Sequence, residues 1–195
     1  MARATLDPRA LIAAAADLAD DEGFDAVTVS AVARRVGVQP ASVYSHLSGL
    51  PAVRRGIHEL ALDELADQVG EAVAGRATYD ALLGLANAHR DFARLKPGRW
   101  SALQQTASGG TAQSPGARRV SGLLVGTLRG YELKESALVD ASRLVGATIN
   151  GYVALEAGGG FAHRSPATTD SWFAVVAALD RALRSWPDDE ERNPR

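Results

Sequence analysis

The side chains that could do chemistry in this sequence cluster between residues 28 and 54, and their chemistry suits nucleic acid. The amide of Gln39 can pair with the edge of adenine, and the methyl group of Ala41 can contact that of thymine. A hydroxyl or an imidazole, as at Tyr44 or His46, can hydrogen-bond to a phosphate, and so can an arginine. The candidate DNA contacts are Thr28, Arg34, Gln39, Pro40, Ala41, Ser42, Tyr44, His46 and Arg54.

Several of these candidates also have a purely structural explanation. Tyr44 could serve mainly in core packing, and His46 could cap the end of its helix. Arg34 and its neighbour Arg35 fit a solvated face as well as a phosphate contact. The local charge favours DNA, because four arginines and no acidic residue occur from residue 28 to residue 58 of a chain whose net charge is −2. A cationic patch on an acidic protein is typical of phosphate binding.

Two short helices joined by a tight turn are predicted from Thr28 to Leu47. Thr28 precedes an apolar face with helical spacing and can cap the first helix. Gly37 can end that helix because a positive φ costs glycine little, and the proline after it suits the first turn of a second helix. Ala33, Gly37 and Val43 supply the small residue, the turn and the branched anchor of a helix-turn-helix. A plain helical hairpin is the alternative.

The rest of the chain keeps a helical periodicity and lacks strand signals, so we expect an all-α fold. A first helix is expected to begin at Asp7-Pro8 and to end before Gly23. Together with the two helices of the helix-turn-helix, it completes a three-helix DNA-binding domain. The further helices are expected at about residues 50–75, 79–95, 100–107, 120–128, 135–157 and 166–186, with a flexible loop at 108–116. The predicted domains are residues 1–50, a helix-turn-helix DNA-binding domain; 51–187, a larger helical effector-binding and dimerisation domain; and 188–195, a charged, disordered tail.

The composition excludes several other classes of protein. With 46% hydrophobic and 23% charged residues, the chain should be globular, and no apolar run is long enough to span a membrane. It lacks cysteine and a signal peptide, which fits the cytoplasm. No HExxH, GxSxG or glycine-rich phosphate loop occurs, so we predict no enzyme activity, no catalytic residues, no metal and no cofactor.

From Leu6 to Ala61 the sequence resembles the TetR family of bacterial transcriptional regulators. The resemblance rests on a first helix ending in EGF, on VTVSAVARRVGVQPASVYSHLSGLPAV, and on the Ser-x-Tyr-x-His run that starts at Ser42. It implies that the helix from about Gln39 lies in the major groove of DNA. A Lys usual in that family is Leu50 here, which removes one phosphate contact; Arg54 and its neighbour are close enough to compensate.

The C-terminal half is similar to the branch of the family with a Trp-His-Gly signature in its ligand domain. The matching segment is residues 149–161, in which Asn150 stands where His is common. The resemblance implies a homodimer that places its two recognition helices about 34–36 Å apart on a palindromic duplex operator. The last two long helices are expected to form the dimer face. Gly146 and Gly151 either allow close approach there or relieve crowding inside one copy.

A small-molecule pocket in the second domain is also implied. Its effector should be hydrophobic or aromatic, and its binding should release a repressor from DNA. The alternative is a helical small-molecule-binding or adaptor protein that has lost specific DNA binding, which substitution of Tyr44 or Gln39 would distinguish. The predicted lining, each member of which ordinary core packing would also explain, is His89, Phe92, Trp100, Leu103, Gln104 and Asn150.

Overall fold

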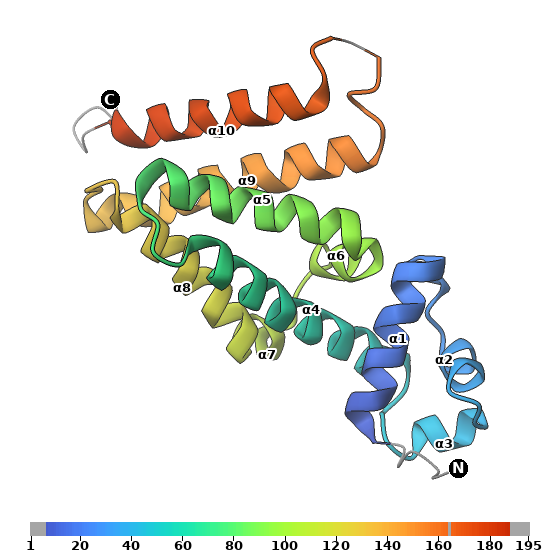
Figure 1. Ribbon diagram of the computed structural model, residues 1–195. Coiled ribbons are helices and arrows are strands. Elements are labelled where there is room, and N and C mark those ends of the chain that lie inside the picture. The colour runs from blue at the N-terminus through green and yellow to red at the C-terminus, as the bar shows by residue number, and fades with distance from the viewer. Residues whose placement is uncertain (1–6, 164, 188–195) are drawn as a thin grey trace, which may run out of the picture. The chain divides into compact units, whose positions relative to one another are not determined.

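The structure, a computed structural model, describes residues 7–163 and 165–187 of the 195. Every regular element in these ranges is helical, which confirms the predicted all-α class (Figure 1). The elements are α1 (Pro8–Glu22), η1 (Phe24–Ala26), α2 (Val29–Arg35), α3 (Pro40–Tyr44), α4 (Leu50–Val73), α5 (Thr78–Leu95), α6 (Pro97–Leu103), α7 (Gly109–Ala112), α8 (Pro115–Arg129), η2 (Glu135–Ala137), α9 (Leu138–Ala157) and α10 (Thr168–Arg184).

The chain folds into two compact units. Among the described residues, the first unit comprises 7–67 and 92–120, and the second comprises 68–91, 121–163 and 165–187. This grouping follows packing, whereas the predicted division after residue 50 concerns function. The functional division therefore stays a prediction, and the predicted charged tail lies outside the described residues.

Local signals set the two ends of α1 as predicted. Asp7 caps the helix, since its carboxylate accepts a hydrogen bond of 2.7 Å from the backbone of Ala10. At the other end Gly23 has a φ of +94° and donates its backbone N–H to Ala19 at 2.9 Å. A positive φ of this kind favours glycine, so the sequence stops the helix at this point.

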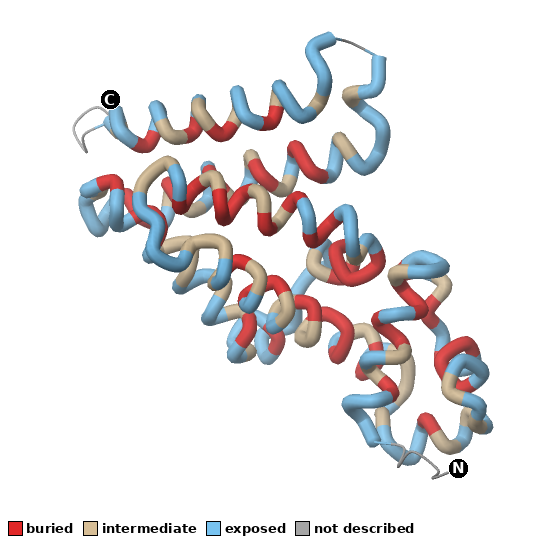
Figure 2. The backbone as a smooth tube through the Cα atoms, in the orientation of Figure 1, coloured by how far each residue is buried: buried red, intermediate tan, exposed pale blue. Residues whose placement is uncertain are grey.

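The core of the first unit is formed by small and branched side chains from α1, α2, α3 and the start of α4. Figure 2 shows buried positions alternating with exposed ones along α1, as expected of an amphipathic helix. The fully buried members of this cluster include Leu11, Ala15, Leu18, Val27, Val32, Val43, Val53 and Ile57. Packing against these residues fixes the short helices α2 and α3, which are too short to be stable alone.

The second unit is held together around Trp172 of α10, whose side chain is fully buried. Its indole N–H donates to the side chain of Asn87 at 2.7 Å, and its ring lies 5.0 Å from that of Tyr152. Arg90 lies over the same indole and makes a two-pronged ion pair with Glu156 of α9 at 2.8 and 2.5 Å. These contacts join α5, α9 and α10.

Two predicted segments differ from the structure. The prediction placed a break at residues 96–98 and a helix from Trp100, but α6 begins at Pro97 because proline fits a first helical turn. The loop expected at 108–116 contains the short helix α7, and α8 starts at Pro115, five residues before the predicted start. Ser108 caps α7 by accepting from Thr111 at 3.2 Å. In the part of the chain described, no helix is both long and apolar enough to cross a membrane.

Candidate nucleic-acid interface

The helix-turn-helix is built by a cap, a turn and two packed side chains. Thr28 accepts a hydrogen bond of 3.1 Å from the backbone of Ala31 and so caps α2. Gly37 adopts a φ of +72° in the turn, and the following residue donates back to Ala33 at 2.9 Å. Ala33 is 1% exposed and Val43 is fully buried. The predicted triplet of small residue, turn glycine and branched anchor is therefore present.

The polar side of α3 faces away from this core. Gln39 occupies the N-cap position, yet its side chain makes no capping hydrogen bond and is exposed. Ala41 is exposed, Pro40 and Ser42 are half-buried, and the carbonyl of Ser42 accepts from the Ser45 hydroxyl at 2.7 Å. The amide of Gln39 and the methyl of Ala41 are thus available to another molecule.

Tyr44 and His46 lie at the far end of α3 with their side chains in solvent. Tyr44 is 60% exposed, which disfavours its alternative role in core packing. His46 is exposed, and its backbone N–H donates to Val43 at 3.0 Å. A hydrogen bond from the main chain needs no particular side chain, so this contact does not explain why a histidine stands there.

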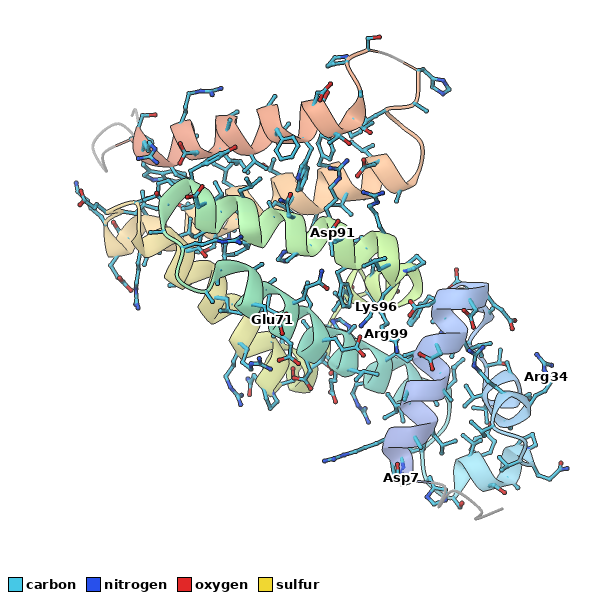
Figure 3. The ribbon with its side chains drawn as sticks, in the orientation of Figure 1. Asp7, Arg34, Glu71, Asp91, Lys96 and Arg99 are labelled. Carbon is cyan, nitrogen blue, oxygen red and sulfur yellow. The ribbon has the colours of Figure 1, made fainter. Side chains whose placement is uncertain are left out.

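The arginines of this unit divide into paired and available groups. Arg35 makes an ion pair with Asp21 at 2.7 Å, so a structural role accounts for it. Arg34 is exposed, and Figure 3 shows its side chain pointing away from α1. Arg54 lies over the ring of Phe24, 5.2 Å from its centre, and is part-exposed. Arg54 has only a long ion pair of 3.9 Å with the exposed Asp25, so Arg34 and Arg54 are the two predicted arginine contacts that can still meet phosphate.

An ion-pair network that the sequence did not reveal ties α6 to α1 and α4 within the same unit, and it centres on Arg99, which is labelled in Figure 3. The backbone of Arg99 donates to Asp20 at 2.9 Å, and its guanidinium pairs with Asp20 and, at 2.8 Å, with Asp17. Its Nε lies 3.1 Å from Glu64. Burial works to lower the pKa of Arg99, but these carboxylates raise it above the usual value. No pattern of residue spacing in the sequence indicates that these four residues, which are far apart in the chain, form a network.

The six residues predicted for an effector pocket are divided between the two units. Phe92, Trp100, Leu103 and Gln104 belong to the first; the two aromatic rings are buried and Gln104 is exposed. In the second unit, Nδ1 of His89 lies 2.8 Å from the carbonyl of Leu85, and burial lowers the pKa of His89. Asn150 donates to the carbonyl of Gly146 at 2.8 Å.

Four cavities in the described structure are lined by other residues. The largest of these four has a volume of about 550 Å³ and lies at the turn between α9 and α10. Its lining includes Tyr152, Phe161, His163, Ser165, Thr168 and Ser171. Among the described residues, no group of three histidines or carboxylates could hold a metal ion. The predicted six-residue lining stays a prediction.

Two segments of the chain match known protein families. Residues 11–48 match the family described as bacterial regulatory proteins, tetR family, and residues 82–179 match the tetracyclin repressor-like C-terminal domain. The chain is 30% identical over 158 residues to the uncharacterized HTH-type transcriptional regulator Rv0681 of Mycobacterium tuberculosis, across 78% of this chain and 71% of that protein. It is 37% identical over 100 residues to the uncharacterized regulator YobS of Bacillus subtilis, across 51% and 52%.

Solved structures share the fold. BioQ of Mycobacterium smegmatis superposes with a TM-score of 0.72 at 19% identity, covering 93% of this chain and 100% of that one. BioQ with its natural double-stranded DNA operator gives 0.60 at 20% identity, with coverage of 90% and 99%. A TetR variant from Acinetobacter baumannii in complex with minocycline gives 0.64 at 21% identity, with coverage of 97% and 100%.

The fold and the helix-turn-helix define a DNA-binding transcriptional regulator and not an enzyme. Within that class, the chain belongs to the tetR family of bacterial regulatory proteins.

Proposed function

We propose that this protein is a ligand-responsive cytoplasmic repressor that binds a palindromic operator as a homodimer and is released by a small molecule. The observation that carries the proposal is the exposed polar surface of α3, held by a buried core on its other side. Gln39, Ala41 and Ser42 would contact base edges, where side-chain amides and methyl groups discriminate between bases. Thr28, Arg34, Tyr44, His46 and Arg54 would contact the DNA backbone and fix the register.

The proposed dimer face lies on α9 and α10. Large apolar side chains stay exposed there, with Val139, Leu155 and Phe173 at 57%, 54% and 45%. A Cβ added at Gly146 or Gly151 would meet no atom of this chain within 4 Å, so crowding inside one copy does not account for these glycines. In a dimer, these glycines would allow α9 of a second copy to approach closely. Burial of this surface would favour association by the hydrophobic effect.

An effector pocket in the helical C-terminal part completes the proposal. The cavity of about 550 Å³ falls within the usual range for small-molecule sites, roughly 300–1,000 Å³, and aromatic rings line part of it. None of the six residues predicted from the sequence, His89, Phe92, Trp100, Leu103, Gln104 and Asn150, lines this cavity, so that lining stays a separate prediction. The Trp-His-Gly branch is the proposed subfamily. BioQ has been solved with a DNA operator and TetR with minocycline, which supports both ligand classes here.

In the proposed switch, binding of the effector displaces α4. The two helix-turn-helix domains of the dimer then no longer match the spacing of the major grooves. Arg99 supports this coupling because it pairs α6 with both α1 and α4, through Asp20 and Glu64. Any shift of α6 would therefore act on α1 and α4 within the unit that carries α3. The size of the switch is limited by the effector's difference in affinity for the two states.

Selection from random duplex DNA with the purified protein, at two salt concentrations, tests the proposal. A palindromic motif with half-sites about one helical turn apart is expected. Weak binding that enriches no motif and vanishes as salt rises would mean phosphate attraction alone. That result would favour the alternative function, a helical small-molecule-binding or adaptor protein without specific DNA binding.

A further inference from the structure

A small cavity rich in hydrogen-bond donors lies beside the first turns of α4, within the first unit. Its walls come from η1, from α4 and from the segment that joins α6 to α7, and its volume is about 190 Å³. Pockets for drug-sized molecules have roughly 300–1,000 Å³. This cavity is too small for such an effector and suits a compact ion or acid group.

The lining of the cavity carries positive charge. Arg54, Arg55 and His58 face it from α4, and Gln105 lines it from the end of α6. No aspartate or glutamate is found among the described residues that line it. Burial lowers the pKa of His58, against the opposing effect of Glu59, so near neutral pH the imidazole is an uncharged ring that can donate one hydrogen bond.

The strongest pointer to an anion is Arg54. Its Nε is buried and has no hydrogen-bond partner among the described residues. Its ion pair with Asp25 is long, at 3.9 Å, and that carboxylate is fully exposed. A buried N–H without an acceptor is unfavourable, and an oxygen atom placed in the cavity would satisfy it.

Two of the hydroxyl groups on the same wall already have partners. Thr111 donates to Glu59 at 3.3 Å, and Ser108 lies 2.9 Å from the Thr111 hydroxyl. These bonds hold the carboxylate of Glu59 on the Thr111 side, where it is not part of the lining. The donors left for a ligand are therefore the guanidinium groups, the imidazole, the Thr106 hydroxyl and one N–H of the Gln105 amide, which also donates to the carbonyl of Ser101 at 3.4 Å.

We propose that this cavity binds a compact oxyanion, with Arg54 Nε donating to it and Arg55, His58 and Gln105 completing the site. The shared chemistry is that of a phosphate or carboxylate group, either as a free ion or as part of a small acid. Such a site differs in place and in ligand class from the proposed hydrophobic effector pocket. Arg54 is also a proposed contact to the DNA backbone, so the test is made without DNA, which separates this site from the proposed function.

The test is thermal unfolding of the full chain without DNA, with sodium phosphate replacing sodium chloride at constant ionic strength. A specific site should raise the Tm along a saturating curve, by about 3 °C when phosphate is in roughly tenfold excess over its Kd. Phosphate also stabilises proteins non-specifically by exclusion from their surface, and that effect does not saturate. A parallel titration with acetate distinguishes a carboxylate from a phosphate site by the larger shift.

Three variants decide the outcome. Arg54→Met removes the donor, and Gln105→Glu places a negative charge in the wall at an exposed position, so both should lose the saturating rise. Gln113→Glu makes the same charge change at an exposed residue outside the lining and should keep it. An equal, non-saturating rise in all four proteins, with both ions, would overturn the proposal. So would a saturating rise that Gln105→Glu leaves intact.

Discussion

The backbone of Gly98 lies directly against that of Ala19, where the first turn of α6 meets the end of α1. A Cβ placed on Gly98 would lie 2.0 Å from the Ala19 carbonyl carbon and 2.1 Å from its oxygen. Only a residue without a side chain allows this approach. The adjacent Arg99 then reaches Asp20, so α1 and α6 are joined by both close packing and charge.

Gly98→Ala should destabilise the protein by about 1–3 kcal/mol, because the new methyl group would force two backbone segments apart. The free energy of unfolding in urea measures the effect. Gly122→Ala is the matched control in α8, where an added Cβ meets nothing within 4 Å. The control should gain up to about 1 kcal/mol from helix propensity. Equal effects of the two substitutions would count against the close contact.

Asp20→Asn should lower stability by about 1–3 kcal/mol, since it leaves the buried guanidinium of Arg99 with a weaker partner. The neighbouring substitution Asp21→Asn breaks an ion pair whose carboxylate is 62% exposed and should cost at most about 1 kcal/mol. Chemical denaturation of both variants provides the measurement. A larger loss at Asp21 than at Asp20 would refute the assigned role of Arg99.

Acid should destabilise the second unit through His89. Burial lowers the pKa of His89 in the folded chain below the ordinary histidine value of 6.5, although the hydrogen bond with the Leu85 carbonyl opposes this effect. The unfolded chain therefore takes up the proton first, and stability that is present above pH 6.5 is lost as the pH falls towards the folded pKa.

The measurement is the free energy of unfolding between pH 7.5 and 5. His89→Gln should remove part of the pH slope, up to about 1.4 kcal/mol per pH unit. Gln113→Asn, at an exposed position without a titratable group, should retain the wild-type slope. If His89→Gln had no effect on the slope, the burial of a neutral imidazole would not be the cause.

Gly151→Leu should convert the proposed homodimer to monomer without unfolding it. The added side chain meets no atom of its own chain at the Cβ, so the single copy should keep its helix content. A second copy packed on α9 would be pushed away. Sedimentation velocity gives the mass, and Gly122→Leu on α8 is the control that should leave it unchanged. A Gly151→Leu protein that stays dimeric would exclude a close α9 contact.

The helix-turn-helix was predictable because short-range signals define it. Thr28, Ala33, Gly37 and Val43 each act within a few residues of their position: a cap, a crossing point, a turn and an anchor. The sequence predicts the start of α6 three residues late, at Trp100, because Pro97 is also typical of a helix break. Proline is compatible both with a helix break and with the first turn of a helix. Only the packing of α6 against α1 decides between these two structures.

Long-range features were not accessible in the same way. Arg99 and Asp20 are 79 residues apart in the sequence, and nothing in either local pattern indicates that they pair. The cavities likewise depend on side chains brought together from distant segments, as Phe24 and Gln105 are. The predicted pocket residues share a suitable type and a place on amphipathic helices. That pattern predicts burial, but it does not predict which buried side chains leave a cavity between them.

The most direct test of the central claim, that α3 reads DNA through its exposed face, is to repeat the DNA selection with Gln39→Ala. The wild type should select a palindrome, and the variant should lose its preference at one position in each half-site, a loss of about 1–3 kcal/mol in discrimination. Gln113→Ala, at an exposed glutamine outside the helix-turn-helix, should select the wild-type motif. An unchanged motif and affinity for Gln39→Ala would contradict this assignment of the reading surface.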